Sequence, residues 1–265
     1  MHEINQEIAK IIEEHKNSLS EAIVSRQYEL QPEIWTTYGE KGKELSVRDS
    51  NHHFNYLVEA LKQSDPTLFG DYIEWLKQLF EGIKIPSEAL PKMLECTEEV
   101  LHKLLPPEMT QIIDEYLSAA KKRIQMKIET QASFITQDNP LHDVAGQYLE
   151  LLLKGERHLA ANLILQAVSK GESVKNIYLY VFQISQYEIG RLWHSNKVSV
   201  AQEHYCSAAT QLIMSQLYSY VFSTEKIGRK LVAACVGGEL HEIGVRMVAD
   251  FFEMEGWDTY YMGAN

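Results

Sequence analysis

The chain has 265 residues, of which 45% are hydrophobic, and its formal net charge is −12 at pH 7. The length allows about two domains, the apolar content excludes a disordered chain, and the acidic balance argues against a broad nucleic-acid interface. Cys96, Cys206 and Cys235 have no CxxC spacing, and no apolar run approaches the ~18 residues of a membrane span. We therefore expect a cytoplasmic protein without disulfides and with no membrane or direct nucleic-acid partner.

Residues 1–130 are predicted to form a domain of about six helices with short connections and no strands. Ser87 is placed to cap one helix after Pro86, and the prolines of Leu105–Glu108 suit the first turn of the next. The stretches whose apolar residues recur at the helical period are Asn5–Ser18, Asp49–Lys62 and Leu68–Phe80.

A polar segment, Ser133–Pro140, predicts a linker at residues 131–140. Helix-length stretches separated by short turns follow it, and this arrangement predicts an antiparallel four-helix bundle over residues 141–225. The stretches are Leu141–Lys154, Glu156–Lys170, Val174–Trp193 and Val198–Thr224.

From residue 228 onward, the pattern becomes strand, helix, strand. Lys230–Val236 and Gly256–Met262 are apolar runs of strand length, and Glu242–Glu255 between them has a helical period. Such a unit opens a doubly wound parallel sheet, which needs about five strands. We expect a mostly α protein that ends in an incomplete α/β domain at 228–265. Either the chain is a fragment of a longer protein, or other strands come from elsewhere.

The turn between the expected strand and helix, Val236–Gly244, combines glycines with a glutamate and a histidine. His241 is expected at the carboxyl edge of the sheet, where ligands of open α/β folds bind. Glu239 is near enough to accept the second imidazole N–H and fix the ring for a metal, and Gly244 allows a bulky group to approach. Alternatively, the glycines only form the turn and the histidine is solvated, since the segment lacks the dinucleotide and phosphate-loop fingerprints.

The pattern Glu239-x-His241-x-x-Gly244 resembles the signature of cobalamin-binding Rossmann domains. The resemblance implies that His241 is the lower axial ligand of cobalt and that Glu239 orients it. It also implies that the segment after Gly244 continues as the family does, with an apolar helix, a glycine and a strand.

A second motif lies in the expected bundle, where Trp193 is followed by nine residues and then by Glu203-His204. This spacing resembles the cap of adenosylcobalamin photoreceptors of the CarH type. The resemblance implies that Trp193 and Glu203 pack around the adenosyl group, and that His204 can ligate cobalt from above after photolysis. A core aromatic and a solvated helix face are the plain alternatives. Methyl-carrying corrinoid proteins share the bundle and the lower histidine, but not this cap.

The N-terminal region lacks the winged helix with which CarH-type repressors begin. Ala22–Glu44, Asn51–Leu61 and Leu105–Glu108 resemble instead the globin-like domain of RsbR-type stressosome sensors, which photocobilins join to cobalamin domains. The resemblance implies a linear bilin such as biliverdin, with haem as the alternative. His53 is otherwise a core histidine, and Cys96 is either a thioether attachment point or a small core residue. The candidate bilin contacts are Arg26, Tyr28, His53 and Tyr56, with Trp35, Tyr38 and His52 nearby.

Together these resemblances predict a light-responsive sensor, rather than an enzyme, that binds adenosylcobalamin between the bundle and the Rossmann-like domain. Photolysis of the cobalt–carbon bond would change the bundle conformation and so signal to a downstream protein. We expect a homodimer or a higher homo-oligomer. The alternatives are a corrinoid methyl carrier, a cobalamin mutase subunit, or an RsbR-like stress sensor with a vestigial cobalamin site.

Overall fold

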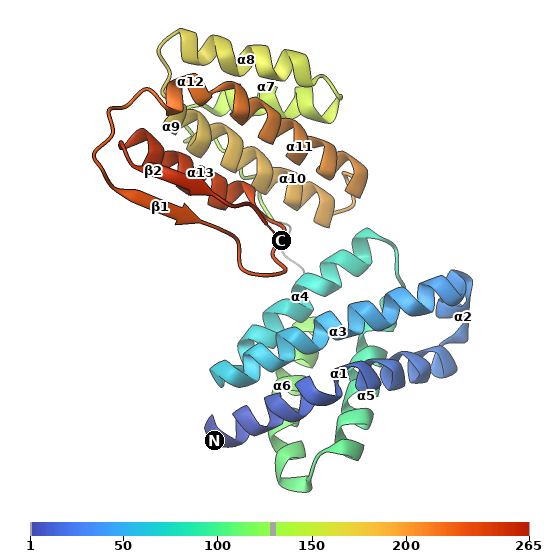
Figure 1. The fold of residues 1–265 in the computed structure, drawn as a ribbon. Coiled ribbons are helices and arrows are strands. Elements are labelled where there is room, and N and C mark those ends of the chain that lie inside the picture. Colours follow the sequence, from blue (N-terminus) through green and yellow to red (C-terminus); the bar gives the residue numbers. More distant parts are fainter. Residues whose placement is uncertain (1, 128–130, 265) are drawn as a thin grey trace. The chain divides into compact units, whose positions relative to one another are not determined.

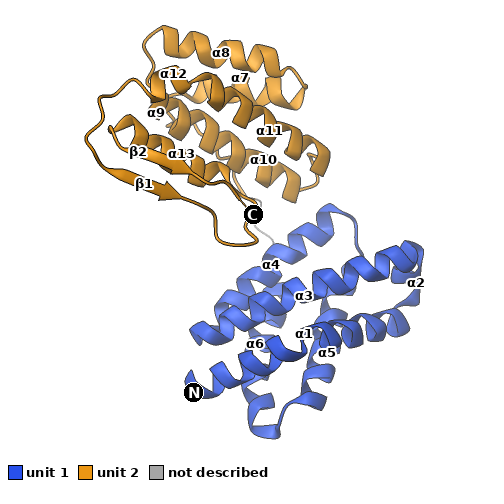
Figure 2. Ribbon diagram, in the orientation of Figure 1, with its two compact units in different colours: residues 1–130 blue, residues 131–265 orange. Residues whose placement is uncertain are grey.

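The computed structural model describes residues 2–127 and 131–264 and divides the chain into two compact units, Met1–Thr130 and Gln131–Asn265 (Figures 1 and 2). Each unit has its own hydrophobic core. The expected boundary at residue 130, like Asn265, lies outside the described residues. The described residues are mostly helical, and the strands among them form a single two-stranded sheet, so the expected mostly α class is confirmed.

Unit 1 is helical in its described residues. Helix α1 packs against α3 and α5, and α4 packs against α6, so that residues such as Ile12, Leu61 and Leu94 are fully buried between them. The elements are α1 (His2–Leu30), α2 (Pro32–Trp35), the 3₁₀ turn η1 (Thr36–Tyr38), α3 (Gly39–Gln63), α4 (Pro66–Gly82), α5 (Ala89–Leu104) and α6 (Pro107–Gln125).

Local sequence signals mark three of the helix starts in the described part of unit 1, where a proline begins α2, α4 and α6. The Asp65 carboxylate accepts the Thr67 backbone N–H at 2.9 Å and caps α4. The predicted cap at Ser87 is wrong, because the chain turns tightly after Pro86 and α5 begins only at Ala89. The Ser87 hydroxyl bonds to the Glu88 side chain at 3.4 Å instead of to a helix N–H group.

The first part of unit 2 is a bundle of helices, and all four expected stretches are helical. A π-helix interrupts the third stretch. The fourth is interrupted at Leu217, whose N–H bonds to the Met214 carbonyl, and it continues as a short helix to Val221. The elements are α7 (His142–Leu153), α8 (Arg157–Ser169), α9 (Val174–Ile177), the π-helix η2 (Tyr178–Gln183), α10 (Ile184–His194), α11 (Val200–Gln216) and α12 (Tyr218–Val221).

The second part of unit 2 is the expected strand–helix–strand segment, with β1 (Lys230–Ala233), α13 (Ile243–Met254) and β2 (Asp258–Tyr261). The strands pair in parallel, and β1 ends three residues earlier than predicted. Helix α13 packs on the bundle through Met247, which belongs to the bundle core. The opposite side of the sheet is open, since Val232 is 68% exposed. In the described residues, no helix has both the length and the apolar character needed to cross a membrane.

Candidate functional site

The loop between β1 and α13 holds His241 just beyond the carboxyl end of the sheet. Glu239 Oε1 accepts the His241 backbone N–H at 2.7 Å and lies 2.5 Å from the ring Nδ1. These hydrogen bonds lower the pKa of the Glu239 carboxyl, which stays a carboxylate and can only accept. In the neutral ring the proton is therefore on Nδ1, and the Nε2 lone pair is available to a ligand. The His241 side chain is 96% exposed, so no described residue of unit 2 covers that nitrogen.

The glycines around His241 keep its surroundings open. Gly238 adopts a φ of +85°, which favours glycine and shapes the turn after β1. In the described structure, a Cβ added at Gly237, Gly238 or Gly244 would meet no atom within 4 Å. A bulky planar group can therefore approach the ring and the first turn of α13, and this observation fits a tetrapyrrole with a metal at its centre.

Glu242 is a residue of this site that the sequence analysis missed. Its Oε1 accepts from Gln211 Nε2 at 3.0 Å, and its Oε2 accepts from the Tyr261 hydroxyl at 2.9 Å and from the Ala264 N–H at 3.3 Å. Hydrogen bonds from Tyr261 and Gln211 lower the pKa of the Glu242 carboxyl. One side chain thus joins α11, the start of α13 and the end of β2. The sequence feature that could have identified Glu242 was its position as a carboxylate at the start of an expected helix.

Arg246 fixes the direction in which α13 lies against α11. Its side chain is buried and donates to the Gln211 carbonyl at 3.1 Å, to Ser215 Oγ at 2.8 Å and to the Tyr218 hydroxyl at 3.0 Å. Glu242 contacts Gln211 of α11. Arg246 lies one turn after Glu242, and it contacts Ser215, which lies one turn after Gln211 in α11. The two helices therefore run in the same direction, and residues of α11 before Gln211 extend past the start of α13 and the carboxyl edge of the sheet.

Glu203 and His204 lie on this extending part of α11. Glu203 and Ser207 precede Gln211 at intervals of four residues and so share its face of the helix. At ~1.5 Å of rise per residue, Glu203 and His204 lie about 10–12 Å beyond the Gln211–Glu242 contact. Glu203 Oε1 accepts from Ser207 Oγ at 3.0 Å, and Oε2 contacts the exposed His204 ring.

Trp193 lies at the same end of the bundle. Gln186 bonds to both Ser207 and Thr210 of α11 at 3.0 Å, which places it on the face of α10 that meets α11. Trp193 is seven residues further along that face, and α10 approaches the start of α11 from the opposite direction. Between them a Cβ at Gly190 would have no described atom within 4 Å. The half-buried Trp193 side chain thus lies on the face of α10 that meets α11, about one turn after the open position at Gly190.

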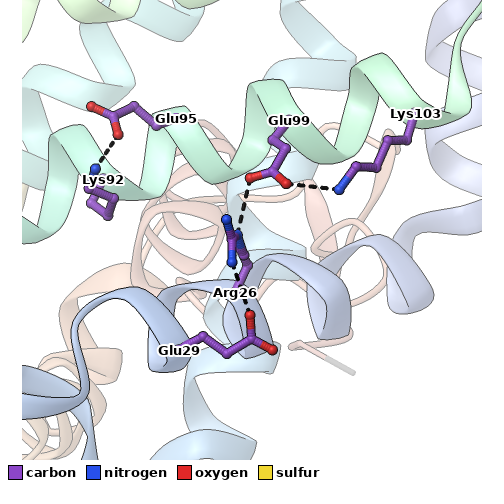
Figure 3. A network of polar contacts seen from close by, with 6 residues as sticks. All are labelled: Arg26, Glu29, Lys92, Glu95, Glu99 and Lys103. Atoms are coloured by element: carbon purple, nitrogen blue, oxygen red, sulfur yellow. Dashed lines mark hydrogen bonds and ion pairs between the residues drawn. The ribbon is translucent and has the colours of Figure 1, made fainter.

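In unit 1, Arg26 of α1 lies in a network of polar contacts with residues of α5 (Figure 3), and it lines a groove between these helices. Its guanidinium donates to Glu99 and to Glu29 at 3.1 Å each, and Lys103 donates to the other Glu99 oxygen at 2.8 Å. The groove has a volume of about 410 Å³, and Ala22, Val100 and Leu104 provide its apolar lining.

The other candidate bilin contacts lie in two separate places. Tyr28 stacks on Trp35 with ring centroids 6.0 Å apart, whereas Tyr56 stacks on Tyr72 at 3.8 Å. His53 Nδ1 is 2.6 Å from the Tyr72 hydroxyl, and burial lowers the His53 pKa to about 4. The cavity beside His53 measures about 10 Å³, far below the 300–1,000 Å³ typical of ligand pockets. The structure thus does not bring Arg26, Tyr28 and His53 to one pocket.

Cys96 has the properties of a core residue rather than of an accessible attachment point for a bilin. Its side chain is fully buried in the core of unit 1, and burial raises the pKa of its thiol. Because the thiolate is the reactive form, the structure disfavours the attachment alternative.

Residues 144–218 match the protein-family model described as B12 binding domain. The matched segment runs from α7 to the first residue of α12 and includes Trp193, Glu203 and His204; the sheet and His241 follow it. The match supports a cobalamin-binding protein with a tetrapyrrole-type cofactor. No curated protein matches the chain.

Proposed function

We propose that the protein is a light-responsive, non-enzymatic sensor that binds adenosylcobalamin between the helical bundle of unit 2 and the β1–α13 loop. The shared direction of α11 and α13 carries this proposal. It extends the bundle residues Trp193, Glu203 and His204 past the sheet edge at which His241 projects. The B12-binding match over the bundle gives independent support.

His241 would hold the cofactor from the side of the sheet. A neutral imidazole with its Nδ1–H given to a carboxylate has a basic Nε2, which is a competent ligand for cobalt. Glu239 supplies that carboxylate and is itself held by the His241 backbone N–H. The open space around Gly237, Gly238 and Gly244 leaves room for the corrin ring.

The bundle residues would cover the opposite face and recognise the nucleoside. Stacking of an aromatic ring on a base is worth ~1–3 kcal/mol, and Trp193 is the ring available there. The Glu203 carboxylate can accept ribose hydroxyl groups in place of Ser207. Adenosylcobalamin supplies a cobalt–carbon bond that light breaks, and His204 offers an exposed imidazole on the same side.

Glu242 gives the sensor a route from the site to the bundle. It follows His241 directly in sequence and bonds to Gln211, on the helix that holds Glu203 and His204. A movement of the β1–α13 loop would therefore act on α11 through one hydrogen-bonded side chain. Bilin binding in unit 1 stays a prediction, and the groove at Arg26 is the site we propose for it.

Visible spectroscopy of the full chain tests the proposal. The protein is loaded with adenosylcobalamin in darkness, freed of unbound cofactor and illuminated with green light. We expect a spectral change, and we expect the product to differ in His204→Ala but not in His158→Ala, an exposed histidine of α8. Free adenosylcobalamin is given the same light dose for comparison. If the illuminated bound cofactor and the illuminated free cofactor have the same spectrum, the proposal is contradicted. Preferential binding of methylcobalamin would instead indicate a methyl carrier.

A further inference from the structure

Three side chains between α5 and α6 in unit 1 offer ligands that no part of the cobalamin proposal uses. One carboxylate oxygen of Glu98, one of Asp114 and an imidazole nitrogen of His102 all lie within 4.8 Å of one another. The geometry points to a binding site for a divalent transition-metal ion, such as Zn²⁺ or Co²⁺, formed by these residues.

The backbone already aligns these ligands. Glu98 and His102 are four residues apart on α5, so both project from one face of that helix. Asp114 comes from α6, which packs against α5, and His102 Nε2 lies 2.7 Å from Asp114 Oδ1. Metal bonds of ~2.0–2.2 Å place ligand atoms about 3–3.5 Å apart, so only rotamer adjustments are needed to admit an ion.

The donor set determines which ion would bind. One imidazole and two carboxylates form a mixed nitrogen and oxygen set that suits Zn²⁺, Co²⁺ and Mn²⁺ better than it suits Ca²⁺. Three protein ligands also leave at least one coordination position for water. All three side chains are partly exposed, so an ion can reach the site without unfolding of unit 1.

Lys121 of α6 competes with the metal. Its ammonium group is 2.8 Å from Glu98 Oε2 and neutralises one of the two carboxylates when no ion is bound. A divalent ion would replace that ammonium group as the counter-charge. Removal of the lysine should therefore strengthen metal binding. If the cluster served only as a set of structural ion pairs, removal of the lysine would weaken the cluster instead.

Calorimetric titration of the full, cobalamin-free chain with Zn²⁺ tests the inference. We expect one tight site, with His102→Gln weakening it at least about tenfold and Lys121→Met tightening it severalfold. His158→Gln, at an exposed histidine of α8 in unit 2, is the matched control and should leave this site unchanged. Substitution with Co²⁺ should give a visible ligand-field band that His102→Gln abolishes. Equal binding by wild type and His102→Gln, or weaker binding by Lys121→Met, would overturn the inference.

Discussion

Gln211 of α11 donates through Nε2 to Oε1 of Glu242, at the start of α13, over 3.0 Å. This hydrogen bond joins the helix that holds Glu203 and His204 to the residue that follows His241. The same carboxylate accepts from Tyr261 at the end of β2, so bundle, loop and sheet meet at one side chain.

Glu242→Ala should destabilise the attachment of the strand–helix–strand segment to the bundle. The substitution removes an ionised acceptor and leaves the Gln211 and Tyr261 donors unpaired, which should cost about 1–3 kcal/mol. Native-state hydrogen exchange at the amides of α13 and β2 measures this loss as a lower free energy of local opening. Glu225→Ala, at an exposed glutamate of the preceding loop, is the control. An equal effect of both substitutions would contradict the role of Glu242.

Tyr178→Phe should weaken the same interface from its buried side. The Tyr178 hydroxyl donates to Asp250 Oδ2 at 2.8 Å, and burial raises the pKa of the Asp250 carboxyl. When folding raises the pKa of a carboxyl, the folded protein loses stability as the pH rises from the pKa of that group in the unfolded chain to its pKa in the folded chain. Because the hydroxyl favours the charged form, we expect Tyr178→Phe to cost about 1–3 kcal/mol.

Unfolding in denaturant, monitored by hydrogen exchange of the α13 amides, measures how much stability Tyr178→Phe loses. The variant should lose more stability at neutral pH, where Asp250 is charged, than at a pH at which it is protonated. The exposed tyrosine variant Tyr220→Phe serves as the control. A loss that does not depend on pH would argue against Asp250 as the partner that matters.

His53 should make unit 1 less stable in acid. Burial, and to a smaller degree the charge of His52, lower the pKa of His53 from 6.5 to about 4. Below pH ~6.5 the unfolded chain therefore binds a proton at His53 that the folded state does not bind. The free energy of unfolding should fall by about 1–3 kcal/mol as the pH drops from ~6.5 toward ~4. Urea unfolding of wild type and His53→Gln at the two ends of this range should show the larger loss in wild type. A His53 ring that titrates near its ordinary pKa by NMR would refute the explanation.

The linker should become more accessible when its anchor on α10 is removed. Glu188 accepts the Phe134 backbone N–H at 3.0 Å, and Arg191 donates to the Gln131 carbonyl at 3.4 Å. We expect Glu188→Ala to accelerate limited proteolysis within residues 131–139 roughly fivefold, the factor that corresponds to about 1 kcal/mol. Glu150→Gln, on the exposed side of α7, should leave the cleavage rate as in wild type.

Short-range spacing was enough to predict part of the site. Only Leu240 separates Glu239 from His241, so a contact between them needs only a turn, and the structure shows it. The helices of both units and the parallel pairing of β1 with β2 likewise follow from local periodicity and connection length.

Contacts between distant segments could not be predicted in this way. Arg246 and Asp250 lie in an amphipathic helix, and a periodic pattern places such charged residues on the solvent side, yet both are buried against the bundle. In unit 1 the sequence offered Arg26, Tyr28 and His53 as one set, but each faces a different neighbour. Which residues share a pocket depends on how α1, α3 and α5 pack, and hydrophobic periodicity does not determine that packing.

The most direct test of the cobalamin account is an electron paramagnetic resonance spectrum of the bound cofactor in its Co(II) form. The chain is produced with ¹⁵N-labelled histidine, so that a histidine ligand splits the cobalt lines into doublets instead of the triplets given by ¹⁴N. We predict doublets in the labelled wild type and their loss in His241→Ala, with His158→Ala unchanged. Triplets that persist in the labelled wild type would show that cobalt is not held by a histidine of this chain.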